Sequence, residues 1–129
     1  MVETSKIYKT FISSDGFEIL VGKSARSNDI LTFKLSHQND FWLHVAPTSG
    51  SHVIIRNPDN LSKMPKSTLR EAAALAIFHS KSKSGGRVAV NYTQCRNVRK
   101  ERGAPAGQVQ IQRFQTVKAS PQERPEEKH

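Results

Sequence analysis

The sequence of 129 residues predicts an α+β domain in which one long and one short helix pack on a mostly antiparallel β-sheet. The strand-like and helix-like segments do not alternate regularly, as parallel βαβ folds require, and most neighbouring strands have connections short enough for hairpins. The length allows one hydrophobic core and leaves no room for a second domain of normal size. We therefore expect a single domain over residues 1–118 and a disordered polar tail over residues 119–129.

The first two elements are predicted to form a β-hairpin. Residues 6–12 and 17–21 are rich in β-branched and aromatic side chains, and Asp15-Gly16 between them suits a tight turn with positive φ angles. Residues 24–35 are interpreted as the short helix, with Asn28 or Asp29 as its N-cap.

The next two segments, residues 40–45 and 51–56, are predicted strands joined by a turn that contains proline and glycine. Successive side chains of a strand point to opposite faces of the sheet. Alternation therefore places Trp42 and His44 on the same face of the first strand, and His52 and Arg56 on the same face of the second.

Residues 65–82 are predicted to form the long helix, because apolar residues recur there at helical spacing. Pro65 suits a first helical turn, Thr68 and Glu71 have the spacing of a capping box, and Gly85-Gly86 is expected to end the element.

Residues 87–93 and 108–118 are predicted to be the last two strands, with a basic run and a turn-rich loop at residues 103–107 between them. From Ser120 onward the composition is polar and charged, which predicts disorder.

The formal charge of +9 is concentrated in one third of the chain. Residues 80–118 hold nine Lys and Arg against Glu101 alone, a net charge of +8. A field of this kind attracts polyanions, so nucleic acid is the expected partner class. The alternative is a solvated face that keeps a small domain soluble.

The sequence predicts a cytoplasmic protein that does not enter a membrane. Cys95 is the single cysteine and cannot form an internal disulfide, which fits a reducing compartment. No segment approaches the roughly 20 apolar residues needed to cross a bilayer.

The two histidines of the central strands, His44 and His52, invite a metal or acid–base interpretation. No histidine or cysteine spacing resembles a structural zinc site, and we expect neither a metal nor a cofactor. The histidines are expected to form local hydrogen bonds or to contact phosphates and bases, beside Trp42 as a stacking platform. Trp42 as a plain core residue remains an alternative.

No catalytic triad signature or phosphate-binding glycine loop is present, so a catalytic role is not expected. Gly50 and Ser51 offer backbone amides and a hydroxyl to one phosphate, or form a tight strand connection. The best candidate is the basic run, because Arg stacks on bases and forks onto phosphates. The candidate nucleic-acid contacts are Trp42, His44, Ser51, His52, Arg56, Arg96, Arg99, Lys100 and Arg102.

Several spaced motifs, in a fixed order between Phe11 and Lys118, resemble the NFACT-R domain. They are Phe11-Ile12-Ser13-Ser14-Asp15-Gly16-Phe17, Val21-Gly22, Asn28-Asp29, Asp40-Phe41-Trp42-Leu43-His44-Val45, Gly50-Ser51-His52-Val53, Arg56, Leu69 to Ala76, Val90 to Thr93, Val98-Arg99-Lys100 and Gly103-Ala104-Pro105-Ala106-Gly107.

The NFACT-R domain usually forms the C-terminal part of large fibronectin-binding-protein-like or NEMF-type ribosome quality-control factors. The resemblance implies a role in binding tRNA or RNA of the large ribosomal subunit. The length leaves no room for the other domains of those factors, so we expect a stand-alone version.

Two functions of different classes fit these observations. The first is a non-catalytic RNA-binding module, with DNA binding not excluded. The second is an RNA-modification enzyme, or a subunit of one, that uses a pocket formed by His44, His52 and Asp40. A domain that uses the same fold to bind protein is a third possibility.

Overall fold

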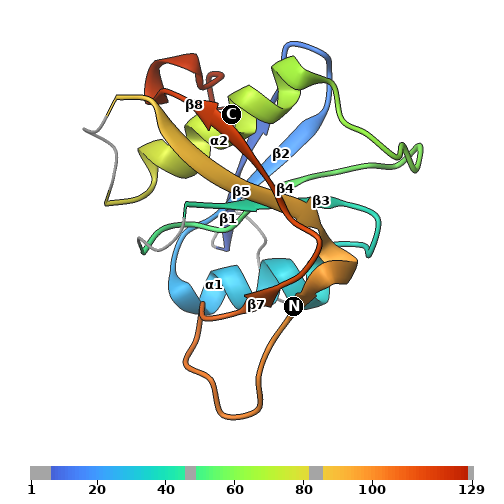
Figure 1. Cartoon of the computed structure of the whole chain (residues 1–129), viewed down its shortest axis with the longest axis vertical. Helices are drawn as coiled ribbons and strands as arrows, with labels where there is room; N and C mark the ends of the chain where they lie inside the picture. The colour runs from blue at the N-terminus through green and yellow to red at the C-terminus, as the bar shows by residue number, and fades with distance from the viewer. Residues whose placement is uncertain (1–6, 46–48, 82–85, 128–129) are drawn as a thin grey trace.

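A computed structural model describes residues 7–45, 49–81 and 86–127. Its centre is a six-stranded antiparallel sheet, with one helix on one face and a layer of short elements on the other (Figure 1). The predicted α+β class is confirmed. In spatial order the strands are β1 (Tyr8–Ile12), β2 (Glu18–Gly22), β4 (Val53–Ile55), β3 (Phe41–His44), β5 (Val88–Gln94) and β8 (Gln115–Ala119).

The predicted N-terminal hairpin is present as β1 and β2, in which Phe11 faces Ile19. Gly16 has a φ of +90°, which a glycine adopts without strain, so the turn forms at the expected place. The end of this hairpin is tied to the long helix, since the hydroxyls of Ser13 and Thr68 lie 2.8 Å apart.

The sheet separates two hydrophobic clusters, as the alternation predicted. Phe41 and Leu43 face the long helix, whereas Trp42 between them lies in the second cluster. The buried members of the second cluster are Leu20, Leu31, Trp42, Ile54, Cys95 and Val98. Both faces of the central strands are therefore covered, and the strands are too buried to offer a flat binding surface.

The short helix α1 (Ala25–Ile30) continues directly into a π-helical turn, η2 (Leu31–Leu35). Its N-cap is Ser24, whose hydroxyl accepts a hydrogen bond from the Ser27 amide at 3.0 Å. The prediction that Asn28 or Asp29 is the cap is wrong, because both lie inside the helix.

The long helix α2 (Lys66–Phe78) ends four residues earlier than predicted. The chain turns at His79 because the following residues pair with the Gly50 segment, where Ser51 N–H donates to His79 O at 3.1 Å. Part of the Gly85-Gly86 stop signal lies outside the described residues.

The predicted capping box of α2 does not form. The helix begins at Lys66, so Thr68 already lies inside it and its hydroxyl donates to Asp15 Oδ2 at 2.7 Å. Glu71 accepts a hydrogen bond from the Ser14 amide at 2.9 Å. These polar side chains attach the helix to the β1–β2 turn instead of capping it.

The segment predicted as one strand over residues 108–118 is divided in two. Its first part, β7 (Gln110–Ile111), pairs with β6 (Val98–Arg99), and only the second part, β8, joins the main sheet. The break is at Arg113, whose φ of +53° turns the chain. A 3-10 turn, η3 (Cys95–Asn97), leads from β5 into β6.

The C-terminal segment differs from the predicted disordered tail. Residues Pro121–Glu123 form a 3-10 turn, η4, that packs against α2, where Arg70 lies 3.8 Å from Glu123. The guanidinium of Arg124 stacks 3.8 Å from the centre of the Phe78 ring. Polar composition misled the prediction because these contacts use charged and aromatic groups.

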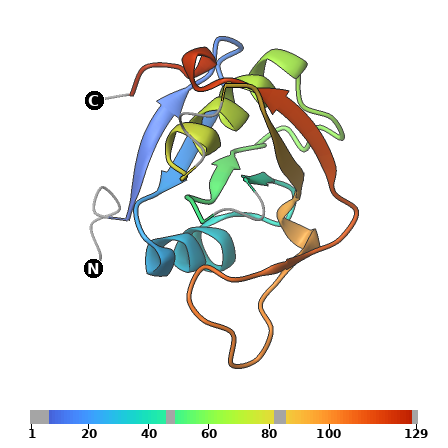
Figure 2. The same cartoon turned by 60° about the vertical axis from the view of Figure 1, so that its left-hand side comes forward.

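The layer that covers Trp42 consists of α1, η2 and the β6–β7 hairpin, whose long loop lies beside α1 (Figure 2). In the part of the chain that the structure describes, no helix is long and apolar enough to cross a membrane.

Candidate nucleic-acid interface

His52 is a buried connecting residue. Its Nε2 lies 3.1 Å from Gly107 O and its Nδ1 lies 2.9 Å from Thr32 Oγ1. The neutral ring satisfies both contacts if Nε2–H donates to the carbonyl and Nδ1 accepts from the hydroxyl. Burial lowers the pKa of His52 to about 4, so the ring stays neutral. With no exposed surface, His52 cannot contact a nucleic acid as predicted.

Trp42 is also buried and packs edge-on against His52, with ring centres 5.2 Å apart. Only 1% of its surface is exposed, so no base can stack on it. The sequence left core and contact roles open for Trp42, and the structure assigns it to the core beneath α1 and the β6–β7 hairpin.

Lys100 holds the loop between β6 and β7 in place. Its Nζ lies 3.0 Å from Asp29 Oδ2 and donates to Gln108 O at 3.0 Å and to Pro105 O. Asp29 also accepts the Gly107 amide hydrogen bond at 3.0 Å. Lys100 was predicted to contact nucleic acid, but its ammonium group donates its hydrogen bonds to groups of the protein.

The pocket predicted from His44, His52 and Asp40 does not form. Asp40 lies before β3 and accepts hydrogen bonds from the amides of His37 and Asn57, both at 2.8 Å. His44 ends the same strand, roughly 13 Å farther along an extended chain. The three groups therefore do not share one pocket, although the rings of His44 and His52 lie 5.3 Å apart.

The remaining two candidates of the central strands are also held by the protein. Arg56 is half-buried, with Nε 3.5 Å from Asp40 Oδ2. The Ser51 hydroxyl donates to Gly22 O at 2.6 Å, which makes the Gly50-Ser51 segment a tight strand connection. The Ser51 hydroxyl hydrogen and part of the Arg56 guanidinium are therefore used inside the protein, and Nη1 of Arg56 also donates to Leu35 O at 3.4 Å.

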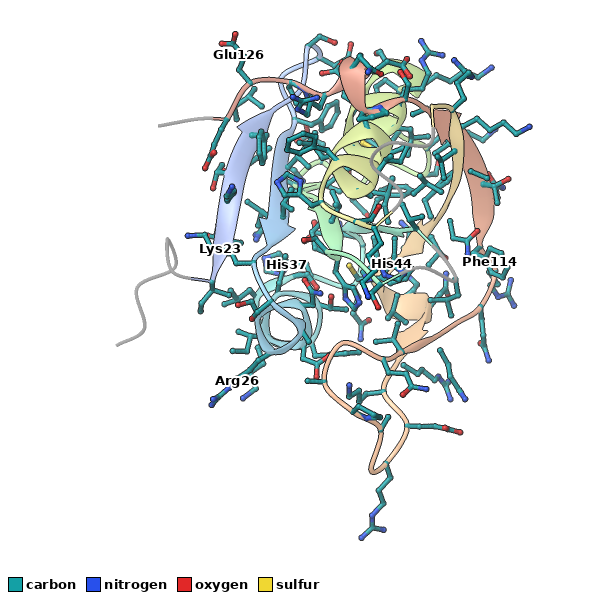
Figure 3. All side chains as sticks on the ribbon, turned by 90° about the vertical axis from the view of Figure 1, so that its left-hand side faces the viewer. Lys23, Arg26, His37, His44, Phe114 and Glu126 are labelled. Atoms are coloured by element: carbon teal, nitrogen blue, oxygen red, sulfur yellow. The ribbon has the colours of Figure 1, made fainter. Side chains whose placement is uncertain are left out.

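His44 is the accessible histidine of the central strands. It lines a pocket of about 570 Å³ together with Lys23, Gly50 and Gln108. Burial lowers the pKa of His44, so the ring is neutral at neutral pH. Figure 3 shows His44 at the end of its strand, above the base of the β6–β7 loop. It remains a candidate contact at the edge of this pocket.

The structure gathers exposed cations on the layer opposite α2, which we call the basic layer and define as residues 23–37 and 95–114. These residues include eight Lys and Arg but only two acidic residues, Asp29 and Glu101. Asp29 is already paired with Lys100. The exposed Arg and Lys of the basic layer are Lys23, Arg26, Lys34, Arg96, Arg99, Arg102 and Arg113.

Sequence reasoning missed Arg26 and Lys34, because they are distant in the chain from the predicted basic run. They join it because the loop approaches α1 so closely that a Cβ on Gly107 would lie 3.2 Å from Ala25 Cβ. Arg26 projects outward from α1 in Figure 3. The only sequence signal was a basic residue beside a short amphipathic segment, which is common on solvated helices.

Two exposed aromatic residues, Phe33 and Phe114, lie on the same layer and were also missed. Phe33 is 40% exposed and Phe114 is 48% exposed. Phe114 follows Arg113 at the start of the edge strand (Figure 3). Exposed rings among unpaired arginines can stack on bases while the cations meet phosphates.

The structure offers no activated nucleophile at Cys95, since burial raises the pKa of its thiol to about 12. Within residues 7–45, 49–81 and 86–127, no three His, Cys, Asp or Glu side chains are grouped to hold a metal ion.

Comparisons with known proteins identify the family to which this domain is similar. The family described as the NFACT protein RNA binding domain matches residues 7–113. The Rqc2 homolog RqcH of Bacillus subtilis is 39% identical over 115 residues, which cover 89% of this chain and 20% of that protein. The ribosome quality control complex subunit NEMF homolog of Drosophila melanogaster is 33% identical over 70 residues, or 54% of this chain and 7% of that protein.

A solved structure has the same fold. The C-terminal part of the fibronectin/fibrinogen-binding protein from Streptococcus suis matches with a TM-score of 0.83 and 28% identity, over 94% of this chain and 48% of that one. The chain spans about a fifth of the length of the bacterial relatives that it matches.

Substitution of Trp42 distinguishes its core role from a contact role. Trp42→Ala is expected to lower the free energy of unfolding by about 3–5 kcal/mol, because it leaves a large cavity. Trp42→Leu fills part of that space and is expected to keep RNA affinity within about twofold. Denaturant unfolding and an RNA titration measure the two effects. A stable Trp42→Leu protein whose affinity falls by the 5- to 150-fold equivalent of one lost base stack, about 1–3 kcal/mol, would show that Trp42 contacts RNA.

The buried His52 predicts a loss of stability in acid. Its pKa is about 4 in the folded protein against 6.5 when unfolded, so the unfolded chain binds the proton first as pH falls. The contribution is fully present above pH 6.5 and is lost as pH falls towards 4, for a total of about 3 kcal/mol.

This acid sensitivity is measured by denaturant unfolding between pH 4 and 7. Burial lowers the pKa of His44 and His79 as well, so His52→Gln serves to isolate one proton. Between pH 5 and 6 the variant should lose about 1.4 kcal/mol less per pH unit than the wild type. Equal slopes for the two proteins would mean that His52 is accessible and protonates in the folded state.

Proposed function

The chain belongs to the family of NFACT protein RNA binding domains, and from this premise we propose that it binds tRNA or RNA of the large ribosomal subunit and catalyses no reaction on it. Three relatives that match 54–58% of the chain are named as subunits of the ribosome quality control complex. The proposed setting is therefore translation in the cytoplasm, during quality control of protein synthesis on ribosomes.

The observation that carries this proposal is that exposed arginines gather on one layer of the fold, the basic layer. Arg96, Arg99 and Arg102 are exposed on one layer, and Arg26 joins them from α1. Among the residues that the structure describes, these four guanidinium groups have no ion-pair partner. Cations that are free and lie on a single layer can each neutralise a phosphate and release counterions.

This layer is suited to following an RNA backbone rather than reading a duplex groove. Its cations come from a helix, a 3-10 turn and a hairpin, and no long helix projects from it to enter a major groove. The exposed Phe33 and Phe114 add surfaces on which the unpaired bases of single-stranded RNA can stack. The arrangement therefore favours loops and unpaired regions of a folded RNA.

A non-catalytic role is supported by what the polar side chains do. His52 is occupied by two hydrogen bonds, Asp40 by two backbone amides, and the Cys95 thiol is buried. A catalytic group must be free to reach its substrate. The candidate acid–base and nucleophilic groups of the central sheet are therefore better explained as parts of the fold.

The proposal is tested by the salt dependence of RNA binding. The variant Arg96→Gln, Arg99→Gln, Arg102→Gln removes three exposed cations but keeps Lys100, which the loop needs. If each arginine neutralises a phosphate, the slope of log K against log salt should become shallower by about two units for single-stranded RNA. Stability should change by less than about 0.5 kcal/mol, since these are surface charges.

A control with three Gln substitutions at Lys9, Lys81 and Lys118 removes the same charge from outside the basic layer. This control is expected to leave the slope nearly unchanged. Titrations with tRNA, a large-subunit ribosomal RNA fragment and single-stranded DNA of equal length identify the preferred partner. Equal slopes for the two variants would contradict a binding face on the basic layer, and a preference for DNA would contradict the RNA assignment.

A further inference from the structure

A pocket of about 430 Å³ lies between the start of α2 and the bend that separates β7 from β8. Lys63 and Lys66 line it on the side of α2, and Arg113 lines it at the bend. The rings of Phe41 and Tyr92 contribute from the sheet. Its volume is within the range of small-ligand pockets and exceeds what a single phosphate needs.

The pocket is positively charged and has no internal neutralisation. None of its lining residues is acidic. Within the described part of the chain, the side chains of Lys63, Lys66 and Arg113 have neither an ion pair nor a hydrogen bond to protein. The first turn of α2 contains no acidic residue, and the carboxylate bonded to that turn, Asp15, accepts from Thr68 and does not line the pocket.

Internal contacts hold the backbone on both sides of the pocket in place before any ligand binds. On one side, the Asn57 side chain exchanges two hydrogen bonds of 2.9 Å with the backbone of Leu61, which holds the loop that leads to Lys63. On the other, Arg113 is held with a φ of +53°, a conformation uncommon for residues other than glycine. The Thr93 hydroxyl lies 3.1 Å from Gln112 O and 3.3 Å from Arg113 O. The backbone on both sides of the pocket therefore needs little rearrangement when an anion binds.

Neutral donors line the same space. Tyr92 donates its hydroxyl hydrogen to Gln115 Oε1 at 2.6 Å, which leaves the amide nitrogen of Gln115 without a protein acceptor in the described structure. Three cations and a free amide are the groups that recognise a phosphate, since each donates and none accepts at neutral pH.

Arg113 belongs both to this pocket and to the basic layer, so the two surfaces meet. We propose that the pocket of Lys63, Lys66 and Arg113 binds a phosphate group of the RNA whose neighbouring phosphates lie on the basic layer. This rests on the RNA binding proposed above and names a second contact region, on the side of the sheet that carries α2. The RNA would therefore bend around the β7–β8 turn, past the exposed Phe114.

The test removes the two lysines, which lie outside the basic layer. The double variant Lys63→Gln, Lys66→Gln is compared with Lys9→Gln, Lys81→Gln in titrations with a single-stranded RNA of mixed sequence at 50–200 mM salt. Two lost phosphate contacts should make the log–log slope shallower by about 1.4 units, so raising salt fourfold should weaken the pocket variant about sevenfold less than the control.

Amide chemical shifts report on the pocket itself. In the wild type, RNA is expected to shift the amide signals of Tyr92 and Gln115, which line the pocket but lie outside the basic layer, and in the pocket variant these shifts should be lost. Inorganic phosphate and adenosine monophosphate are added separately, because either could supply the same chemistry as a free anion. They are expected to bind weakly and to be displaced by RNA.

The outcomes separate the two proposals. If the wild type binds RNA with a steep salt slope but the pocket variant matches the control, the pocket proposal is overturned and the basic layer stands. If adenosine monophosphate still shifts Tyr92 when RNA is saturating, the pocket serves a free nucleotide, and the RNA assignment is overturned. If the wild type does not bind RNA, the proposed function itself fails.

Discussion

Two neighbouring side chains of α1, Asn28 and Asp29, hold the second layer of this protein against its sheet. Asn28 accepts the His52 amide hydrogen bond at 3.0 Å and donates to Gly50 O at 3.3 Å. Asp29 accepts from the Gly107 amide and pairs with Lys100. One turn of helix therefore connects a central strand, a strand connection and a long loop. The exposed arginines keep their positions because these internal contacts are satisfied.

The contacts of Asn28 and Asp29 also explain two buried residues, Gly22 and His52. A Cβ at Gly22 would lie 2.0 Å from Asn28 Oδ1, so glycine is required where the Asn28 side chain crosses the strand. His52 carries the connection on to Gly107 through its ring. Asp29 is paired with Lys100, so it does not neutralise the exposed cations of the basic layer.

Local pattern was enough to predict the fold class, the first hairpin and the two faces of the central strands. Period-two alternation correctly separated Trp42 from Phe41 and Leu43. It did not reveal that both faces are covered, because the cover comes from residues far away in the chain. Trp42 and His52 were therefore predicted as contacts although they are buried.

Features that depend on side-chain contacts across the fold were also missed. The Thr68 and Glu71 pair has capping-box spacing, yet both side chains bond to the β1–β2 turn. Charge counting along the chain found Arg96, Arg99 and Arg102, whereas Arg26 required the packing of the loop against α1. Lys100 was misassigned because its sequence neighbours are exposed and only the structure places Asp29 beside it.

If Asp29 forms the proposed RNA-binding face by fastening the β6–β7 loop to α1, the RNA affinity of Asp29→Asn should depend on this contact more than on charge. Removing an acidic residue from a basic surface should tighten RNA binding if charge alone matters. We expect the opposite sign: the variant should bind RNA several-fold more weakly, and the Gly107 amide should exchange its hydrogen faster than in the wild type. Tighter binding with an equally protected Gly107 amide would show that Asp29 does not hold the RNA-binding face in place.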